Sequence, residues 1–244
     1  MPAAMPETTR PPIQLLCMHG AGAGGWEWAI WSRVFTARGV QVRAPDLVAA
    51  RSGLAATCFA DYRQQVRNWI GPDADDTPGA LRVLAGASLG GLLALSVAAE
   101  VRPAALILVN PMPPALILPR LSGEPYPEIV RWGEQRSIAG TRRVMPDADD
   151  AACLFAFRRW RDESGAALEQ ARRGVTVEFP QCPILVLASE RDTDVPAHVS
   201  RELAVRCGAD FELLAGCSHV GPLLGVRAGH IAERAVSWVL SRLA

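Results

Sequence analysis

A serine lies where its hydroxyl could act as a nucleophile. Ser88 is the central residue of a Gly-Ala-Ser-Leu-Gly pentapeptide at 86–90, between an apolar run at 81–85 and a helix-like run at 89–100. A strand, a tight turn and a helix placed around a serine strain its backbone and hold its hydroxyl clear of the sheet. This context predicts acyl transfer by Ser88. The alternative is a Gly-rich turn whose serine caps the following helix.

A Gly-rich loop follows the first apolar run of the chain. Residues 15–26 begin as a buried strand would and continue, after His19, with small residues up to a tryptophan. Small residues let main-chain N–H groups come close to a ligand, as donors to a negatively charged oxygen must. We expect Ala21, together with Leu89 directly after the serine, to supply the oxyanion-hole N–H groups. Gly22 is the alternative donor from the loop.

The same loop also fits a second pattern. Gly20, Gly22 and Gly25 match the Gly-x-Gly-x-x-Gly fingerprint of dinucleotide sites and follow a strand. The next strand, 40–44, leads into a Pro-Asp pair rather than an acidic residue set for a ribose, and no Lys-Ser/Thr pair is present for a nucleoside triphosphate. No cofactor is therefore expected. No metal is expected either, since the cysteines form no Cys-x-x-Cys pair and no histidine cluster accompanies them.

An acid and a histidine follow two later strand-like runs, at 183–188 and 211–214. Ligand sites of open α/β sheets form at such strand ends. His219 follows the second run, and an imidazole is the side chain whose ordinary pKa suits it to take a proton from a serine hydroxyl. Asp192 and Asp194 both follow the first run. One of them is expected to fix the histidine tautomer, and the other to lie at the start of a helix.

These segments resemble, in their order along nearly the whole chain, the α/β-hydrolase superfamily. The Gly-rich loop and the run 40–47 are most similar to small esterases, of which plant methylesterases and hydroxynitrile lyases are the nearest group. The resemblance implies that the acid is Asp192, four residues before Pro196, and that Asp194 caps the helix. One departure is that Asp46-Leu47 is not followed by the Gly-x-Gly-x-Ser turn common in that group.

The resemblance implies a serine hydrolase that cleaves a carboxylic ester or related acyl bond of a small, apolar substrate through an acyl-enzyme intermediate. A serine at position 88 argues against dehalogenase and epoxide hydrolase chemistry, which need a carboxylate nucleophile. The chain contains no lysine, which argues against a hydroxynitrile lyase. Two alternatives stay open: a slow-turnover ligand-binding or sensor protein on the same fold, and an acyltransferase or carbon–carbon bond hydrolase.

The elements that must position these residues alternate along the chain. Strand-like and helix-like runs follow one another from residue 13 onward, which predicts an α/β fold with a doubly wound, mainly parallel sheet of about six strands. Because the chain enters the sheet directly, the first two strands of the full hydrolase fold are expected to be missing. The expected parts are a flexible tail at 1–12, the core at 13–110 and 178–244, and a helical cap insertion at 111–177.

The expected cap interrupts the alternation and opens with four prolines, which suit a loop better than a helix or strand. Short helices are expected within it over 127–138, 147–161 and 164–173. An insertion at this place would lie over the strand ends and shape the substrate pocket. The candidate pocket walls are apolar: Met112, Leu116, Met145, Phe155 and Trp160.

The composition of the chain limits the classes of partner that the protein is expected to bind. A formal net charge of zero gives no reason to expect attraction to nucleic acid or to an anionic membrane. The uncharged stretch 83–99 contains the serine turn and is better explained as a buried strand and helix than as a membrane span. Six cysteines without a signal peptide predict free thiols in a reducing, cytoplasmic compartment. The expected partner is a small-molecule ester, and no oligomeric state is predicted.

Overall fold

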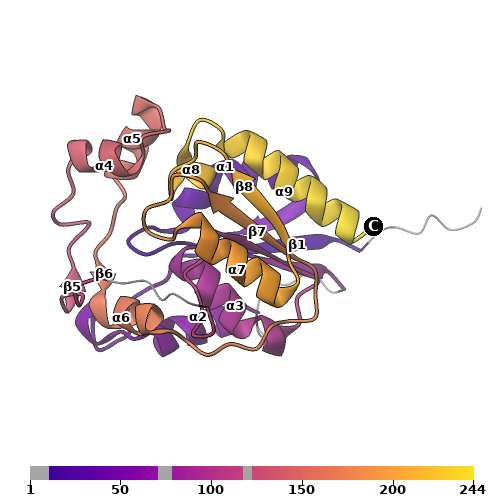
Figure 1. Cartoon of the computed structure of the whole chain (residues 1–244), viewed down its shortest axis with the longest axis horizontal. Helices are drawn as coiled ribbons and strands as arrows, with labels where there is room; N and C mark the ends of the chain where they lie inside the picture. Colours follow the sequence, from indigo (N-terminus) through magenta and orange to yellow (C-terminus); the bar gives the residue numbers. More distant parts are fainter. Residues whose placement is uncertain (1–10, 71–78, 118–122) are drawn as a thin grey trace, which may run out of the picture.

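The structure is a computed structural model that describes residues 11–70, 79–117 and 123–244. The expected tail, residues 1–12, lies outside the described residues except for its last two. In the described ranges, six parallel strands form one sheet in the order β2-β1-β3-β4-β7-β8 (Figure 1). These strands are β1 (Ile13–Met18), β2 (Val40–Arg43), β3 (Leu81–Ala87), β4 (Ala105–Val109), β7 (Ile184–Ser189) and β8 (Asp210–Leu214).

Helices cover both faces of the sheet, and the predicted fold class is confirmed. Helix α1 packs with α9 on one face, and α2 packs with α3 on the other. The helices of the core are α1 (Ala29–Ala37), α2 (Phe59–Ile70), α3 (Leu89–Val101), α7 (Ala197–Cys207), α8 (Gly221–Leu224) and α9 (Ala228–Arg242), with the short 3₁₀ helices η1 (Gly25–Trp28) and η2 (Leu54–Ala56).

Strand β1 shows how the sheet lies between two apolar cores. Leu16 and Met18 point to the core shared with α2 and α3, whereas Leu15 and Cys17 point to the core that contains Trp31 of α1. All five side chains are at most 4% exposed. Strands of a parallel sheet are buried on both faces, and this is why their sequences are continuous apolar runs rather than alternating ones.

The segment between β4 and β7, which we call the cap segment (residues 111–177), adds helices and a small antiparallel sheet in its described part (Figure 1). Helix α6 packs against α2 and α3, while α4 packs with α5. The elements of the cap segment are β5 (Ile129–Val130), α4 (Ile138–Val144), α5 (Asp150–Phe157), β6 (Glu163–Ser164) and α6 (Gly165–Arg173).

One helix predicted in the cap segment is wrong, and a second is shorter than predicted. Strand β5 lies within residues 127–138, where a helix was expected. The carboxylate of Asp162 accepts the N–H groups of Gly133 and of the residue after it, at 2.8 Å each, and so holds this stretch in a turn. The helix expected over 147–161 is limited to α5, which begins after its cap residue Asp149.

Replacing Gly90 by alanine is expected to destabilise the fold by about 2 kcal/mol, because a β-carbon there would overlap the carbonyl oxygens of Met18 and His19. The matched control is Gly229→Ala in α9, where the nearest atom to such a β-carbon is Cγ2 of Ile30 at 3.9 Å, and alanine is the better helix former. Chemical denaturation should show the first variant to be less stable than wild type and the second at least as stable. Equal stability of the two variants would contradict the packing argument.

Candidate active site

Ser88 lies on a strained turn between β3 and α3. Its φ of 51° and ψ of −117° are unfavourable for a residue with a side chain. The turn is held by main-chain bonds: the Ser88 N–H donates to the carbonyl of Val109, and the Ser88 carbonyl accepts the N–H of Met112, both at 3.0 Å. The side chain makes no capping bond to α3, so the alternative of a helix-capping serine does not describe this structure.

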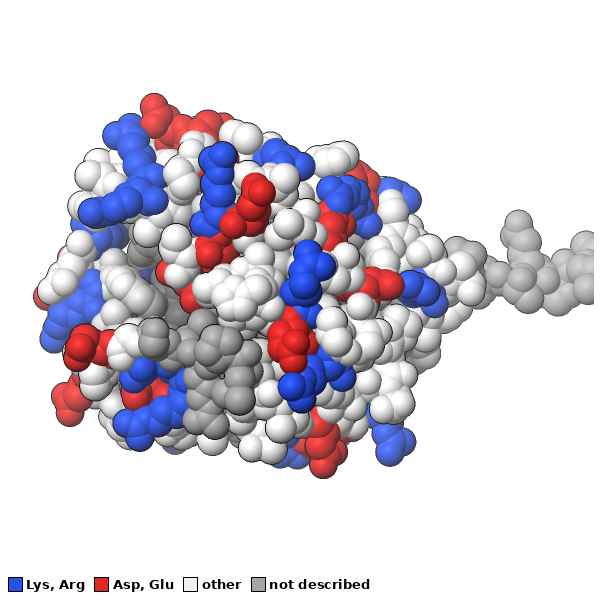
Figure 2. All heavy atoms as spheres, viewed as in Figure 1, with Lys and Arg blue, Asp and Glu red and all other residues white. Residues whose placement is uncertain are grey.

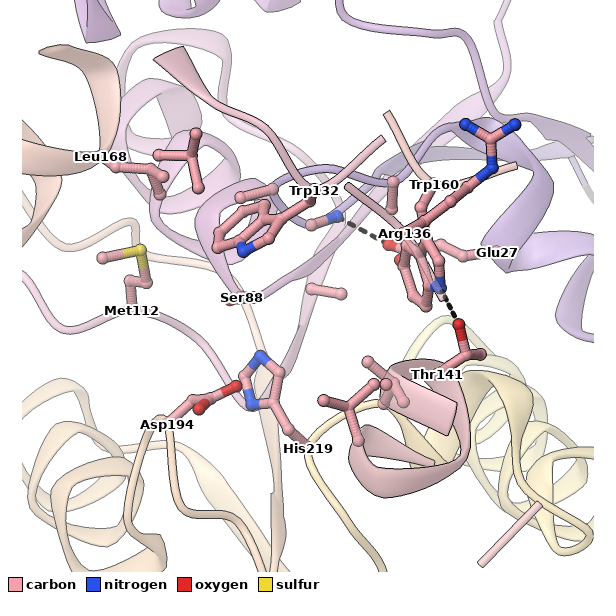
Figure 3. Close-up of a pocket in the computed structure, with 18 of the residues that line it drawn as sticks. Glu27, Ser88, Met112, Trp132, Arg136, Thr141, Trp160, Leu168, Asp194 and His219 are labelled. Carbon is pink, nitrogen blue, oxygen red and sulfur yellow. Dashed lines mark hydrogen bonds between the residues drawn. The ribbon is translucent and has the colours of Figure 1, made fainter. Parts of the chain in front are cut away.

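Ser88 and His219 line one cavity of about 960 Å³ (Figure 3). The cap segment supplies much of the wall around them, including two of the predicted pocket residues, Met112 and Trp160. In the view of Figure 3 the ring of His219 lies beside Asp194 and below Ser88. Within the described residues no hydrogen bond joins the serine hydroxyl to this ring. Such bonds are often long in structures without a substrate.

Three predicted pocket residues do not line this cavity in the part of the chain that the structure describes. Leu116 is 52% exposed on the surface. Met145 is buried in the core beside Cys153. Its side chain therefore stabilises the fold and does not form part of the pocket wall. The ring of Phe155 packs edge-on against Trp26, with centroids 5.7 Å apart.

Asp192 is bonded to the ring of His219. Its Oδ2 lies 2.6 Å from Nδ1, and its side chain is fully buried. Its Oδ1 accepts the N–H groups of Asp194 and Val195 at 2.8 Å each, which fixes the carboxylate on the turn after β7. A carboxylate that accepts from Nδ1–H leaves Nε2 free to take a proton. Burial lowers the pKa of His219, but the hydrogen bond and charge of Asp192, with the charge of Asp194, outweigh it and raise the pKa above its ordinary value.

Asp194 lies beside this pair rather than at the end of a helix. The N-cap residue of α7 is Pro196, without a capping side chain, so the capping role expected for Asp194 is wrong. Instead, Asp194 lines the cavity, and one ligand atom each of Asp192, Asp194 and His219 lie within 4.8 Å of one another. A metal would compete for atoms that are already used, since Asp192 accepts N–H groups on both oxygens. The cluster therefore suits hydrogen bonding better than metal binding.

Asn110 was not singled out from the sequence, although it joins three of the strand ends. Its φ of 44° is again in the left-handed region. Its amide donates to the hydroxyl of Ser189 at 2.9 Å and to the carbonyl of His219 at 2.6 Å, and its oxygen accepts the N–H of Ser189 at 2.7 Å. The only sequence signal was a polar residue directly after an apolar strand. Asn110 thus fixes the His219 loop to β4 and β7.

In the Gly-rich loop after β1, side chains take two of the N–H groups that flank Ala21. Glu27 accepts the N–H of Gly20 at 2.7 Å, and Glu163 accepts the N–H of Gly22 at 3.0 Å. Among the described residues, no acceptor takes the N–H of Ala21, and Leu89 is the first residue of α3, where an N–H has no acceptor in the helix. The side chains of Glu27 and Glu163 occupy the N–H groups of Gly20 and Gly22 that a phosphate would need, which argues against the dinucleotide alternative.

Two residues of the cap segment hold this loop. The N–H and guanidinium of Arg161 donate to the carbonyls of Gly22 and Ala23, at 2.8 and 2.6 Å. The carboxylate of Glu163 accepts the hydroxyl of Tyr62 at 2.6 Å in addition to the N–H of Gly22. The conformation of the loop therefore depends on the cap segment.

His19 fixes the base of the same loop. Its Nδ1 bonds the carbonyl of Gly20 at 2.8 Å, and its Nε2 accepts the N–H of Leu47, also at 2.8 Å. Burial lowers the pKa of His19 to about 4, so the ring is neutral near pH 7. His19 ties two loops together, whereas His219 faces the cavity.

A third residue of the cap segment, Asp147, holds the His219 loop. Its carboxylate accepts the N–H of Ser218 at 3.0 Å and the Ser218 hydroxyl at 2.5 Å. Its own carbonyl accepts the N–H of Val226 at 3.0 Å. The cap segment therefore bonds to both loops that border Ser88.

A parallel sheet with a serine on a strained turn after β3 is the architecture of the α/β hydrolases. A sequence model of the Alpha/beta hydrolase family matches residues 15–227, and the chain therefore belongs to this family. No curated protein sequence matches the chain.

Solved structures of other hydrolases share the fold. A methylesterase, MES16, from Arabidopsis is 17% identical, with a TM-score of 0.68 over 93% of this chain and 99% of that one. A pyrethroid hydrolase from Sphingobium faniae JZ-2 is 18% identical, with a TM-score of 0.68 over 95% of this chain and 97% of that one. A thioesterase domain from the curacin biosynthetic pathway is 16% identical, with a TM-score of 0.64 over 96% of this chain and 92% of that one. The predicted resemblance is confirmed for the family and the fold.

Replacing Asp194 by asparagine is expected to lower the pKa of His219, because the charge of Asp194 is one of the causes that raise it. The hydrogen bond between Asp192 and the ring should persist, so the ring should keep its position and show a single titration step in the folded protein. An NMR titration of the His219 ring measures the shift directly, with Asp150→Asn on the exposed side of α5 as the control. An unchanged or raised pKa in Asp194→Asn would show that this carboxylate does not act on the ring.

Proposed function

We propose that the protein is a serine hydrolase that cleaves a carboxylic ester or related acyl bond, with Ser88 as nucleophile, His219 as base and Asp192 as the acid that orients the ring. The observation that carries this proposal is the bond of buried Asp192 to His219, in a cavity that also contains a serine on a strained turn. Family membership supports a hydrolase in general.

The proposed reaction proceeds in two halves. Nε2 of His219 takes the hydroxyl proton while Oγ of Ser88 attacks the carbonyl carbon, and the N–H groups of Ala21 and Leu89 donate to the developing oxyanion. The C–O bond to the alcohol then breaks, and the alcohol leaves with the proton from His219. Water attacks the acyl-serine in the same way, and the carboxylic acid is released with Ser88 restored.

The substrate we propose is a small ester with an apolar part. The cavity has apolar surface from Met112 and Leu168 on one side, Trp160 on the other and Trp132 between them (Figure 3). The structural neighbours include a methylesterase, which supports a carboxylic ester, and a thioesterase domain, which supports a thioester as the related acyl bond. An acyltransferase, a carbon–carbon bond hydrolase or a slow-turnover sensor would use the same residues and differ in the products formed.

Surface and cysteine chemistry support a small-molecule partner in a reducing compartment. Figure 2 shows acidic and basic side chains interspersed over the displayed face, in line with the zero net charge. All six cysteines are free thiols. None of the helices in the described ranges combines the length and apolar composition needed to span a bilayer. We propose a cytoplasmic location on the basis of the thiols.

Ser88→Ala should remove labelling by a fluorophosphonate probe and lower kcat for simple aryl esters by a factor on the order of a million. The matched control is Ser96→Ala on the same helix, because the Ser96 hydroxyl bonds the carbonyl of Leu93 at 2.7 Å, away from the cavity. Peptide mapping of the labelled wild-type protein identifies the nucleophile. Label on another serine, or full activity of Ser88→Ala, would overturn the proposal, and label without turnover would favour the sensor.

Asp192→Asn should lower kcat by about 10⁴ while the fold stays intact. The oxygen of the asparagine can still accept the N–H groups of Asp194 and Val195. The NH₂ group of the asparagine, however, would face Nδ1 of His219 and force the ring proton onto Nε2. The same aryl ester should be hydrolysed far better by Asp194→Asn, in which the bond to the ring persists. If Asp194→Asn were the inactive variant of the two, the assignment of the acid would be wrong.

A further inference from the structure

Glu27 is a buried acid beside the proposed nucleophile that the reaction described above does not use. It lies in η1 between two tryptophans, is 3% exposed, and lines the same cavity as Ser88 and His219 (Figure 3). A β-carbon built on Gly20 would lie 3.5 Å from Cβ of Ser88 and 3.8 Å from Oε1 of Glu27. The carboxyl group is therefore within reach of a substrate bound at Ser88.

The two oxygens of this carboxyl group have different surroundings. Oε1 accepts the N–H of Gly20 at 2.7 Å. Oε2 has no hydrogen-bond partner and no ion pair among the described residues, although the group belongs to the lining of the cavity. This oxygen is not one of the fully buried polar atoms without a partner, so it is open to the cavity, where a ligand can supply its partner.

Three ionisable groups of the described residues face Glu27. They are the thiol of Cys17 on β1, which burial keeps neutral, the ring of His219 after β8 and the guanidinium of Arg161 in the cap segment. Burial raises the pKa of Glu27 to about 8, although the N–H of Gly20 and the charges of His219 and Arg161 act in the opposite direction. The group is thus mostly protonated near pH 7, and its proton belongs on Oε2, because Oε1 is the acceptor.

We propose that Glu27 is a substrate-binding residue whose Oε2–H donates a hydrogen bond to an ether, hydroxyl or carbonyl oxygen close to the scissile carbonyl. The inference rests on the proposed function of Ser88 and adds a substrate class: esters with an oxygen substituent near the carbonyl, preferred over plain alkyl esters. A site built to bond a substrate oxygen rejects an analogue that lacks it, because a buried donor is then left unpaired. The proton stays on Glu27 throughout.

The experiment compares two aryl esters of equal length, 4-nitrophenyl methoxyacetate and 4-nitrophenyl butyrate, which differ by one ether oxygen in place of a methylene. The measured quantity is the ratio of their kcat/KM values, each corrected for the rate of hydrolysis by hydroxide. Both esters use the same nucleophile and base, so the titration of His219 cancels in this ratio. Wild type should prefer the methoxy ester near pH 7, and the preference should fall as the pH passes through about 8 and Glu27 loses its proton.

Two variants of Glu27 give opposite expectations. In Glu27→Gln the amide oxygen keeps the bond to Gly20 and the NH₂ group replaces Oε2–H, so the preference should persist and become independent of pH. In Glu27→Met no donor is left, and the ratio should fall about tenfold at pH 7. Glu233→Gln, whose side chain pairs with Arg38 on the surface, is the control and should match wild type.

The outcomes separate this inference from the proposed function. If Ser88 is not labelled, the proposed function fails and the inference with it. If Ser88 is labelled and both esters are hydrolysed, but the wild-type ratio shows no preference or no pH dependence, the role of Glu27 alone is overturned. A Glu27→Gln variant that loses the preference as Glu27→Met does would also overturn it, because the isosteric amide keeps both the contact with Gly20 and a donor.

Discussion

The left-handed backbone of Ser88 is the constraint on which the rest of the site depends. A side chain in this conformation costs on the order of 1–3 kcal/mol, and it persists only where the surroundings hold it. Here β4 and the chain that follows it hold the turn through the bonds of Ser88 to Val109 and Met112. Gly90 lets α3 start directly against the end of β1. The Gly-rich loop after β1 is consequently brought next to the serine.

The cap segment does more than line the cavity. Glu163 and Arg161 bond the loop that carries Ala21, and Asp147 bonds the loop that carries His219. A carboxylate that accepts two N–H or O–H donors is a strong anchor, because bonds to a charged acceptor are stronger than neutral ones. Any change in the cap segment that moves these anchors would alter the geometry around Ser88 as well as the walls of the pocket.

The core could be predicted from the sequence because its elements follow local patterns. The apolar run at 81–85 lies within β3, and the helix-like run at 89–100 matches α3 to within one residue, since each is a continuous apolar run that a polar residue follows. The cap segment could not be predicted as well, because tertiary contacts decide it. Residues 127–138 form a strand and a turn only because β6 and Asp162 lie beside them.

The same reasoning explains which site residues the sequence revealed. Ser88 and His219 stand in motifs, whereas Asn110 and Glu27 have no motif, and their importance depends on groups distant in the chain. Of the predicted pocket walls, Met145 is buried in the core instead. Apolar residues of a covering segment pack inward or toward a cavity, and the sequence alone does not distinguish the two directions.

The two carboxyl groups nearest to the proposed reaction differ in the number of donors that meet them, and this difference assigns them opposite tasks. Asp192 accepts three N–H groups, from Asp194, Val195 and the ring of His219, as suits an acceptor that orients an imidazole. Glu27 accepts only one, so burial dominates and keeps it protonated near pH 7. Hydrogen bonds to the charged form favour ionisation, and desolvation opposes it. A single cavity thus contains one acidic side chain that accepts hydrogen bonds and, in our proposal, one that donates a hydrogen bond. The difference between them comes from the number of backbone N–H groups that they meet rather than from the residue type.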